Sequence, residues 1–147
     1  MDFTQLHNNL NNVIANIDNI VIKSAMENEN FIVDLNVSQL EQGQTSEGKS
    51  IEPEYRSPAY TQYKKLIGKK SPGAVPDLKL TGDFHRGFFA RKTNDWIEIH
   101  STDYKEARLR AKYSDAIFGL KTDNLKQLGQ YILPDLIKNI KNELTAS

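Results

Sequence analysis

Two groups of side chains have residue types and spacing that chemistry would use. The first is Pro76-Asp77 followed later by Glu98-Ile99-His100. Metal-dependent nucleases with a PD-(D/E)xK motif hold Mg²⁺ with an Asp and a Glu on adjacent strands, and a Lys two residues after the Glu assists the attacking water. His100 stands where that Lys belongs, and Asp103-Tyr104-Lys105 has the triplet at an expected helix start. Such short matches arise often by chance, so surface carboxylates are the simpler interpretation.

The second group is the three histidines, His7, His85 and His100. His85 and His100 have positions that would let them face each other across a hairpin, but the spacing indicates no third metal ligand. We therefore interpret them as polar surface residues. The chain has no cysteine, and it lacks a phosphate-binding loop, a dinucleotide-binding glycine motif and a nucleophile elbow. These observations predict a protein that is not an enzyme and needs neither cofactor nor metal.

A basic segment is the best candidate for binding nucleic acid. Its cations are Lys64, Lys65, Lys69, Lys70, Arg86, Arg91 and Lys92. Lysine clusters bind phosphates without sequence preference, and nearby aromatic residues could stack on bases, namely Tyr60, Tyr63, Phe88 and Phe89. The sequence has no known RNA- or DNA-recognition motif. A solvated or partner-facing cationic surface is the preferred interpretation, and DNA contact is the alternative.

The charge of the 147-residue chain is zero, yet it is unevenly distributed. Residues 1–60 carry three cations and nine anions, a net charge of −6, and residues 61–92 carry eight cations and two anions, a net charge of +6. The two segments could neutralise each other within one subunit or meet between copies. No apolar run is long enough to span a bilayer, and the start lacks a secretory signal, so we expect an intracellular or particle-borne protein and no membrane contact.

The clearest structural element is an amphipathic helix over residues 3–26. Its apolar residues follow heptad spacing and are Phe3, Leu6, Leu10, Val13, Ile17 and Ile20. We expect this row to pack mainly on the protein's own sheet, with self-association as the alternative.

The middle of the chain combines several signals. Phe31-Ile32-Val33 looks extended, and Ser38 could cap a short helical turn. Ser57-Pro58 begins a helix that Gly68 ends. Residues 41–76 read as an insertion that is mobile or becomes ordered on a partner, and residues 78–83 look like a short strand entering a turn.

The remaining segments predict a hairpin and two helices. Residues 84–92 and 96–100 alternate around the turn residues Asn94-Asp95. A helix then starts near residues 101–103, and a last helix begins at Thr122 or Asp123, with Pro134 kinking or restarting it. The sequence therefore predicts one α+β domain over residues 1–147, in which long N- and C-terminal helices pack on a small antiparallel sheet.

The order of several motifs resembles a group of small tailed-phage proteins common in phages of gut bacteria. The motifs are Gln39-Leu40-Glu41-Gln42-Gly43, residues 46–51, Tyr55, Tyr60, Lys64-Lys65, residues 76–84 and Ile117-Phe118-Gly119-Leu120. Leu78, Thr81, Gly82 and Phe84, with the hairpin and C-terminal helix that follow, resemble more distantly the phage tail-completion and virion-morphogenesis family.

This resemblance implies a non-enzymatic virion protein at the neck, forming a ring of copies between the head connector, or portal, and the tail. The long insertion and zero net charge depart from the usual short, basic member, so head, neck and tail positions all remain open. A ring needs heterologous contacts, which opposite charges suit. The candidate interface residues are Lys64, Lys65, Lys69, Lys70, Arg86, Phe88, Phe89 and Trp96.

Overall fold

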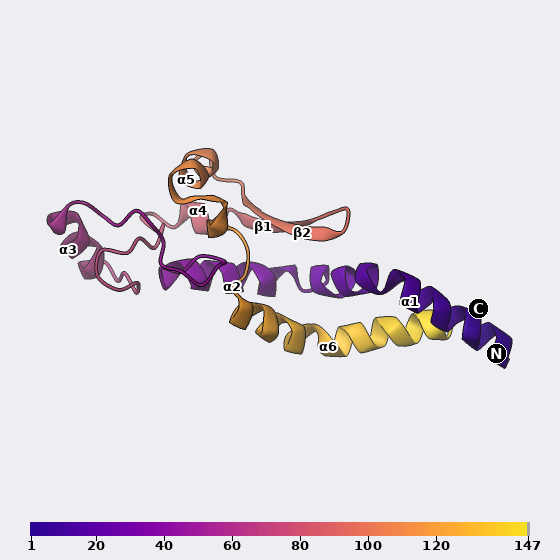
Figure 1. Ribbon diagram of the computed structural model, residues 1–147. Helices are drawn as coiled ribbons and strands as arrows, with labels where there is room; N and C mark the ends of the chain where they lie inside the picture. The colour runs from indigo at the N-terminus through magenta and orange to yellow at the C-terminus, as the bar shows by residue number, and fades with distance from the viewer. Residues whose placement is uncertain (147) are drawn as a thin grey trace.

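The computed structural model describes residues 1–146 and has the predicted α+β character (Figure 1). Its long elements form three layers, in which helices α1 and α2 lie between the β1–β2 hairpin on one side and helix α6 on the other. The elements are α1 (Phe3–Met26), α2 (Glu29–Glu41), α3 (Pro58–Leu66), α4 (Asp83–Arg86), β1 (Phe88–Thr93), β2 (Trp96–Ser101), α5 (Glu106–Tyr113), a 3-10 turn (Asp115–Ile117) and α6 (Thr122–Leu144).

Helix α1 has the predicted bounds, and α2 continues almost end to end with it (Figure 1). The Asp2 carboxylate accepts the N–H of Gln5 at 2.8 Å and caps α1. The extended segment expected at residues 31–33 was wrong, because these residues and Ser38 lie inside α2. Ile32 and Leu35 are buried at helical spacing, and a short apolar run does not by itself distinguish a helix from a strand.

Two buried amides on α2 hold the chain that leads into α6. Asn36 donates to the carbonyl of Ile117 at 3.1 Å and accepts the N–H of Gly119 at 2.9 Å. Gln39 donates to the carbonyl of Gly119 at 3.0 Å and accepts the N–H of Lys121 at 2.9 Å. These four bonds satisfy backbone groups of an irregular segment that has no strand or helix partner for them.

The hairpin prediction is confirmed, with β1 and β2 antiparallel and Thr93 opposite Trp96 at the turn. The strand expected at residues 78–83 was wrong. Leu78 has a φ of 57°, which no strand tolerates, and Gly82, with a φ of 87°, precedes the short helix α4. Helix α4 replaces the first residues of the expected strand at 84–92.

The main core lies between the hairpin, α2 and the segments around α4 and α6. Phe84 and Phe88 meet edge to face at 5.0 Å, and Phe118 lies 5.2 Å from Phe88. The fully enclosed side chains include Leu40, Ile51 and Ile117. Aromatic rings in edge-to-face pairs add stability beyond the area they bury.

Three helix boundaries test the capping predictions. Ser57 accepts the N–H of Tyr60 at 3.2 Å, which confirms the start of α3. Helix α5 begins after Lys105, later than expected, and α6 starts after Lys121 with no side-chain cap. Helix α6 runs through Pro134 as one helix and does not restart there.

Within residues 1–146, no helix is long and apolar enough to cross a membrane.

Candidate assembly surfaces

Lys64 is a buried structural group rather than part of a cationic surface. Its Nζ lies 2.8 Å from Asp77 Oδ1 and also donates to the carbonyl of Lys79. Only 1% of Lys64 is exposed, and Asp77 is equally enclosed, at 4%. Asp77 Oδ1 also accepts from the Tyr55 hydroxyl at 3.3 Å and from the N–H of Lys79 at 3.1 Å. The prediction of Lys64 as an interface residue was therefore wrong: it fastens α3 to residues 77–79.

The other cations of this segment differ in how free they are. Lys65 is exposed, whereas Lys69 donates to the Ser71 hydroxyl at 2.9 Å, and burial lowers the pKa of Lys69. Lys70 is exposed and lies 3.5 Å from Glu41, which Lys79 reaches at 3.1 Å. Partial burial alone would raise the pKa of Glu41, but the hydrogen bond and charge of Lys79 hold it below its usual value.

Within residues 1–146, the ion pairs that join the acidic segment (residues 1–60) to the basic segment (residues 61–92) all involve Glu41. Its cationic partners are Lys70 and Lys79. Arg86 pairs instead with Asp83, three residues earlier, and remains largely exposed. The expected mobility of residues 41–76 stays a prediction; the structure joins this segment to its neighbours through Lys64, Glu41 and α3.

The predicted aromatic interface residues divide between core and surface. Phe88 packs in the core, so its prediction as an interface residue was wrong. Phe89 faces the other side of β1 and stacks on His100 with ring centroids 5.8 Å apart. Trp96 lies at the hairpin tip, is half exposed, and donates from Nε1 to Glu98 at 3.3 Å.

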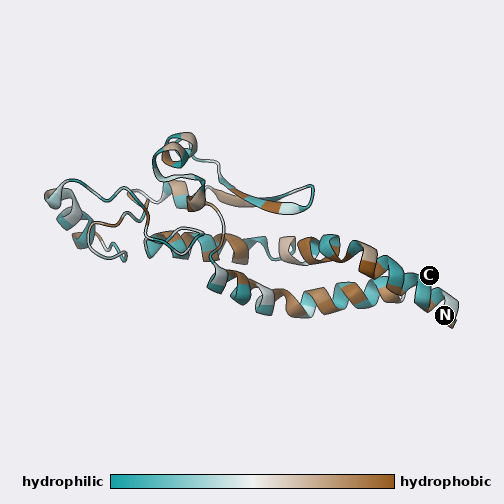
Figure 2. Cartoon of the chain, viewed as in Figure 1, coloured by the Kyte–Doolittle hydropathy of each residue, from teal (hydrophilic) through white to brown (hydrophobic). Residues whose placement is uncertain are grey.

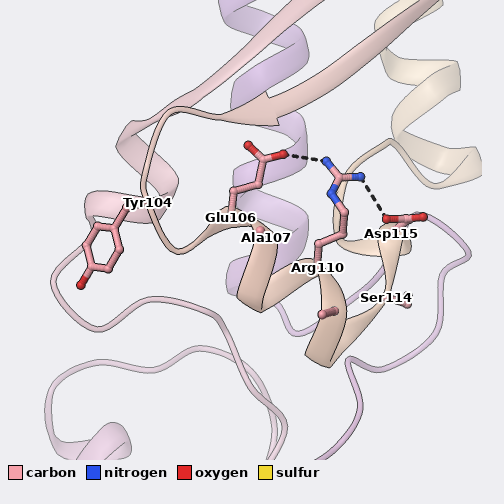
Figure 3. Close-up of a pocket in the computed structure, with 7 residues that line it drawn as sticks. Tyr104, Glu106, Ala107, Arg110, Ser114 and Asp115 are labelled. Carbon is pink, nitrogen blue, oxygen red and sulfur yellow. Dashed lines mark hydrogen bonds and ion pairs between the residues drawn. The ribbon is translucent and has the colours of Figure 1, made fainter.

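A row of hydrogen-bonded polar side chains runs from β2 across α5. The ring nitrogens of His100 lie 3.0 Å from Glu98 and 3.2 Å from Glu106. Arg110 then bonds Glu106 at 2.9 Å and Asp115 at 3.0 Å. Figure 3 shows this last part in a shallow surface depression, with Arg110 between the two carboxylates. The hydrogen bond from His100, with those from Trp96 and Arg91, lowers the pKa of Glu98 to about 2. These hydrogen bonds and ion pairs join α5 to β2, which indicates a structural role for the row.

The residues that were weighed as a nuclease motif or a metal site have separate partners in the structure. Asp77 bonds to Lys64 and Tyr55, whereas Glu98 belongs to the charged row on β2, so their partners are different. His100 lies opposite Phe89 in the hairpin register, so the predicted pairing with His85 was wrong. Within residues 1–146, no group of three His, Asp or Glu side chains is placed to hold a metal ion.

His85 is buried in α4 rather than exposed on the surface. Neither ring nitrogen has a hydrogen-bond partner among the described residues. Burial lowers the pKa of His85 to about 4, so the ring is neutral near pH 7. The interpretation of His85 as a polar surface residue was therefore wrong.

Helices α1 and α6 pack antiparallel along a polar and apolar seam (Figure 1). Val13, Ile20 and Ser24 of α1 are buried there. Asn139 of α6 donates to the Ser24 hydroxyl at 2.9 Å, and Ile132 is buried on the same side of α6. The expectation that the α1 row packs mainly on the sheet was wrong, because α6 and not the hairpin is the main partner of this helix (Figure 1).

Apolar side chains next to this seam remain exposed on both helices. Ile14 and Val21 follow Val13 and Ile20 directly in α1, and Leu133 follows Ile132 in α6. One step forward is a rotation of about 100° around a helix. Because the helices are antiparallel, this rotation carries both rows to the same side of the pair. We call this surface the open face; its residues are Phe3, Leu10, Ile14, Ile17, Val21, Leu133 and Ile137.

The exposure of the open face is large for apolar residues. Phe3 is 90% exposed and Ile14 is 64% exposed. Figure 2 shows apolar segments recurring along the length of both helices. A second apolar patch lies on α3, at the opposite end of the molecule from the chain termini (Figure 1), and consists of Tyr63, Leu66 and Ile67. The heptad pattern of α1 predicted an apolar row. The α3 patch was not predicted, because its residues lie among the lysines of the basic segment.

Comparison with protein-family models, with curated proteins and with solved structures finds no match to this chain.

Proposed function

We propose that this chain is a non-enzymatic structural protein that works as an assembly of copies. The observation that carries the proposal is the open face of α1 and α6. Although α1 bends at Asn16, exposed large apolar side chains recur on both sides of the bend. Exposed apolar groups gathered on one side of a fold mark a protein–protein contact. The resemblance supplies the setting: a ring between head connector and tail in a tailed phage virion, assembled in the host cytoplasm.

The size of the open face supports association between copies. Each of its seven large apolar side chains is at least 37% exposed. Exposed apolar groups of this size supply the core of a protein–protein interface. Helix α1 carries one acidic and one basic residue, Asp18 and Lys23, so its open side brings no net charge to a neighbouring copy.

The presence of two different apolar patches supports a ring rather than a closed pair. A heterologous contact joins one patch to a different patch on the next copy, and successive contacts form a ring when the rotation between copies closes. The open face and the α3 patch lie toward opposite ends of an elongated molecule (Figure 1). The exposed Lys65 offers complementary charge to the exposed acidic side chains of residues 1–60, among them Asp18, Asp34, Glu52 and Glu54.

Electron microscopy and mass spectrometry of purified virions test this proposal. We expect the protein in the mature particle, in a ring at the head–tail junction. Its absence from mature particles would contradict the virion role. Binding of duplex DNA with a steep dependence on salt, lost when Lys65, Lys69 and Lys70 are changed to Glu, would favour the nucleic-acid alternative instead.

A further inference from the structure

A cleft separate from the open face lies between α3, residues 78–82 and α5. Its volume is about 410 Å³, within the range of pockets that hold small ligands or side chains. Aromatic and aliphatic groups form its walls, among them Tyr55, Tyr60, Leu80, Tyr104 and Leu109. Tyr104 and Leu80 are both well exposed at its mouth.

The polar side chains of this cleft are all hydrogen-bond donors or hydroxyls. Its cations are Lys64, Lys79, Lys105 and Arg108, and Thr81 adds a hydroxyl to those of the tyrosines. Among the described residues that line it, none is Asp or Glu. Burial raises the pKa of the Tyr60 hydroxyl, so this group stays a donor. A lining of donors with apolar walls fits an acceptor-bearing anion that also has an apolar part.

The cations of the cleft that have no ion-pair partner indicate how much negative charge a ligand should carry. Lys64 is paired with Asp77 at 2.8 Å, and Lys79 is paired with Glu41 at 3.1 Å. Lys105 lies 3.1 Å from Asp103. Arg108 is exposed and has no ion-pair partner within residues 1–146. One uncompensated guanidinium matches a single carboxylate, whereas a nucleic-acid backbone requires several free cations along its track.

We propose that this cleft binds a peptide segment of a partner protein that carries one carboxylate and one aromatic or large aliphatic side chain. Arg108 binds the carboxylate through its planar fork of N–H groups. The apolar side chain lies against Tyr60, Leu80 and Tyr104, where aromatic walls bury it without ordering many rotatable bonds. This site goes beyond self-association and uses a different surface from the open face.

Fluorine NMR of a ligand peptide tests this site in the full chain, whatever its state of assembly. The probe is an acetylated, amidated tripeptide of 4-fluorophenylalanine, glycine and glutamate, and its twin has glutamine in place of glutamate. We expect line broadening by the wild-type protein with the acidic peptide, and about tenfold weaker binding of the twin. Arg108→Gln should weaken binding of the acidic peptide to the same extent.

Two further variants separate the site from general effects on charge or folding. Arg91→Gln removes an exposed arginine from the hairpin and should leave binding unchanged. Leu80→Glu puts a carboxylate at the mouth of the cleft and should abolish binding of the acidic peptide. Equal broadening by both peptides, unchanged binding in Arg108→Gln, or a stronger response to a thymidine hexanucleotide than to the peptide would overturn the proposal.

Discussion

Around the hairpin, apolar side chains are enclosed on several sides, whereas along α1 and α6 they meet one partner helix. Ile51 and Ile117 are fully buried between loops, strands and α2. Ile14 and Leu133, which have similar apolar side chains, are about half exposed or more. The first region encloses its apolar side chains within one copy, whereas the second leaves apolar side chains in contact with solvent. This difference connects the structure with the proposed assembly.

The largest expected effect concerns the buried ion pair of the enclosed region. Changing Lys64 to Ala leaves the Asp77 carboxylate buried without its cation, so we expect the free energy of unfolding to fall by about 3–5 kcal/mol. The neighbouring exposed Lys65, changed to Ala, should alter it by less than about 0.5 kcal/mol. Urea denaturation of both variants measures the difference. Similar small effects in both would show that Lys64 does not fasten α3.

Two isoleucines of α1 compare the seam with the open face. Ile20→Ala removes buried methyl groups from the seam, so we expect a loss of about 3 kcal/mol in the free energy of unfolding. Ile14→Ala should change the stability of a single copy by less than about 0.5 kcal/mol and should instead reduce the dependence of the melting temperature on protein concentration. An equal loss in dilute solution would contradict the distinction between seam and open face.

His85 makes the enclosed region sensitive to acid. Burial lowers the pKa of His85 to about 4, while the unfolded chain takes up this proton near pH 6.5. The contribution of His85 to the free energy of unfolding is therefore fully present above pH 6.5. It falls as the pH drops toward 4, because in this range only the unfolded state binds the proton. Between pH 7.5 and 5.5, the wild type should lose about 1.4 kcal/mol more than His85→Leu. Parallel pH profiles from urea denaturation would contradict burial of this ring.

The smallest expected effect concerns an exposed ion pair on the hairpin. Arg91 lies 3.3 Å from Glu98, and both side chains contact solvent. Arg91→Gln should lower the free energy of unfolding by at most about 0.5 kcal/mol, and 0.5 M salt should remove most of that difference. A loss comparable with that of Lys64→Ala would mean that exposure does not separate the two kinds of ion pair.

The sequence predicted the elements whose local signals agree with their final environment. The spacing of apolar residues predicted α1, alternation around Asn94-Asp95 predicted the hairpin, and Ser57-Pro58 predicted the start of α3. Each signal depends on residues close together in the chain. Helix α2 was missed because Asn36 and Gln39 occupy buried positions, so its inward row does not look apolar.

The candidate site was predicted less well, because exposure depends on distant contacts. Lys64 belongs to a basic run, and nothing near it in the sequence shows that Asp77 will enclose it. Alternation along β1 places Phe88 and Phe89 on opposite faces but does not say which face is the core. The open face follows from the relative rotation of α1 and α6, which the heptad pattern of one helix does not determine.

Light scattering coupled to size-exclusion chromatography most directly tests the claim that the open face joins copies. The wild-type chain should elute at a multiple of its 16.7 kDa mass. The double variant Ile14→Glu with Ile17→Glu puts two charges on the open face and should elute as a folded single copy. The control, Asn8→Glu with Asn12→Glu, adds the same charge to polar positions of α1 and should elute like the wild type. A single copy for the wild type at 100 µM, or an unchanged assembly in the open-face variant, would contradict the account.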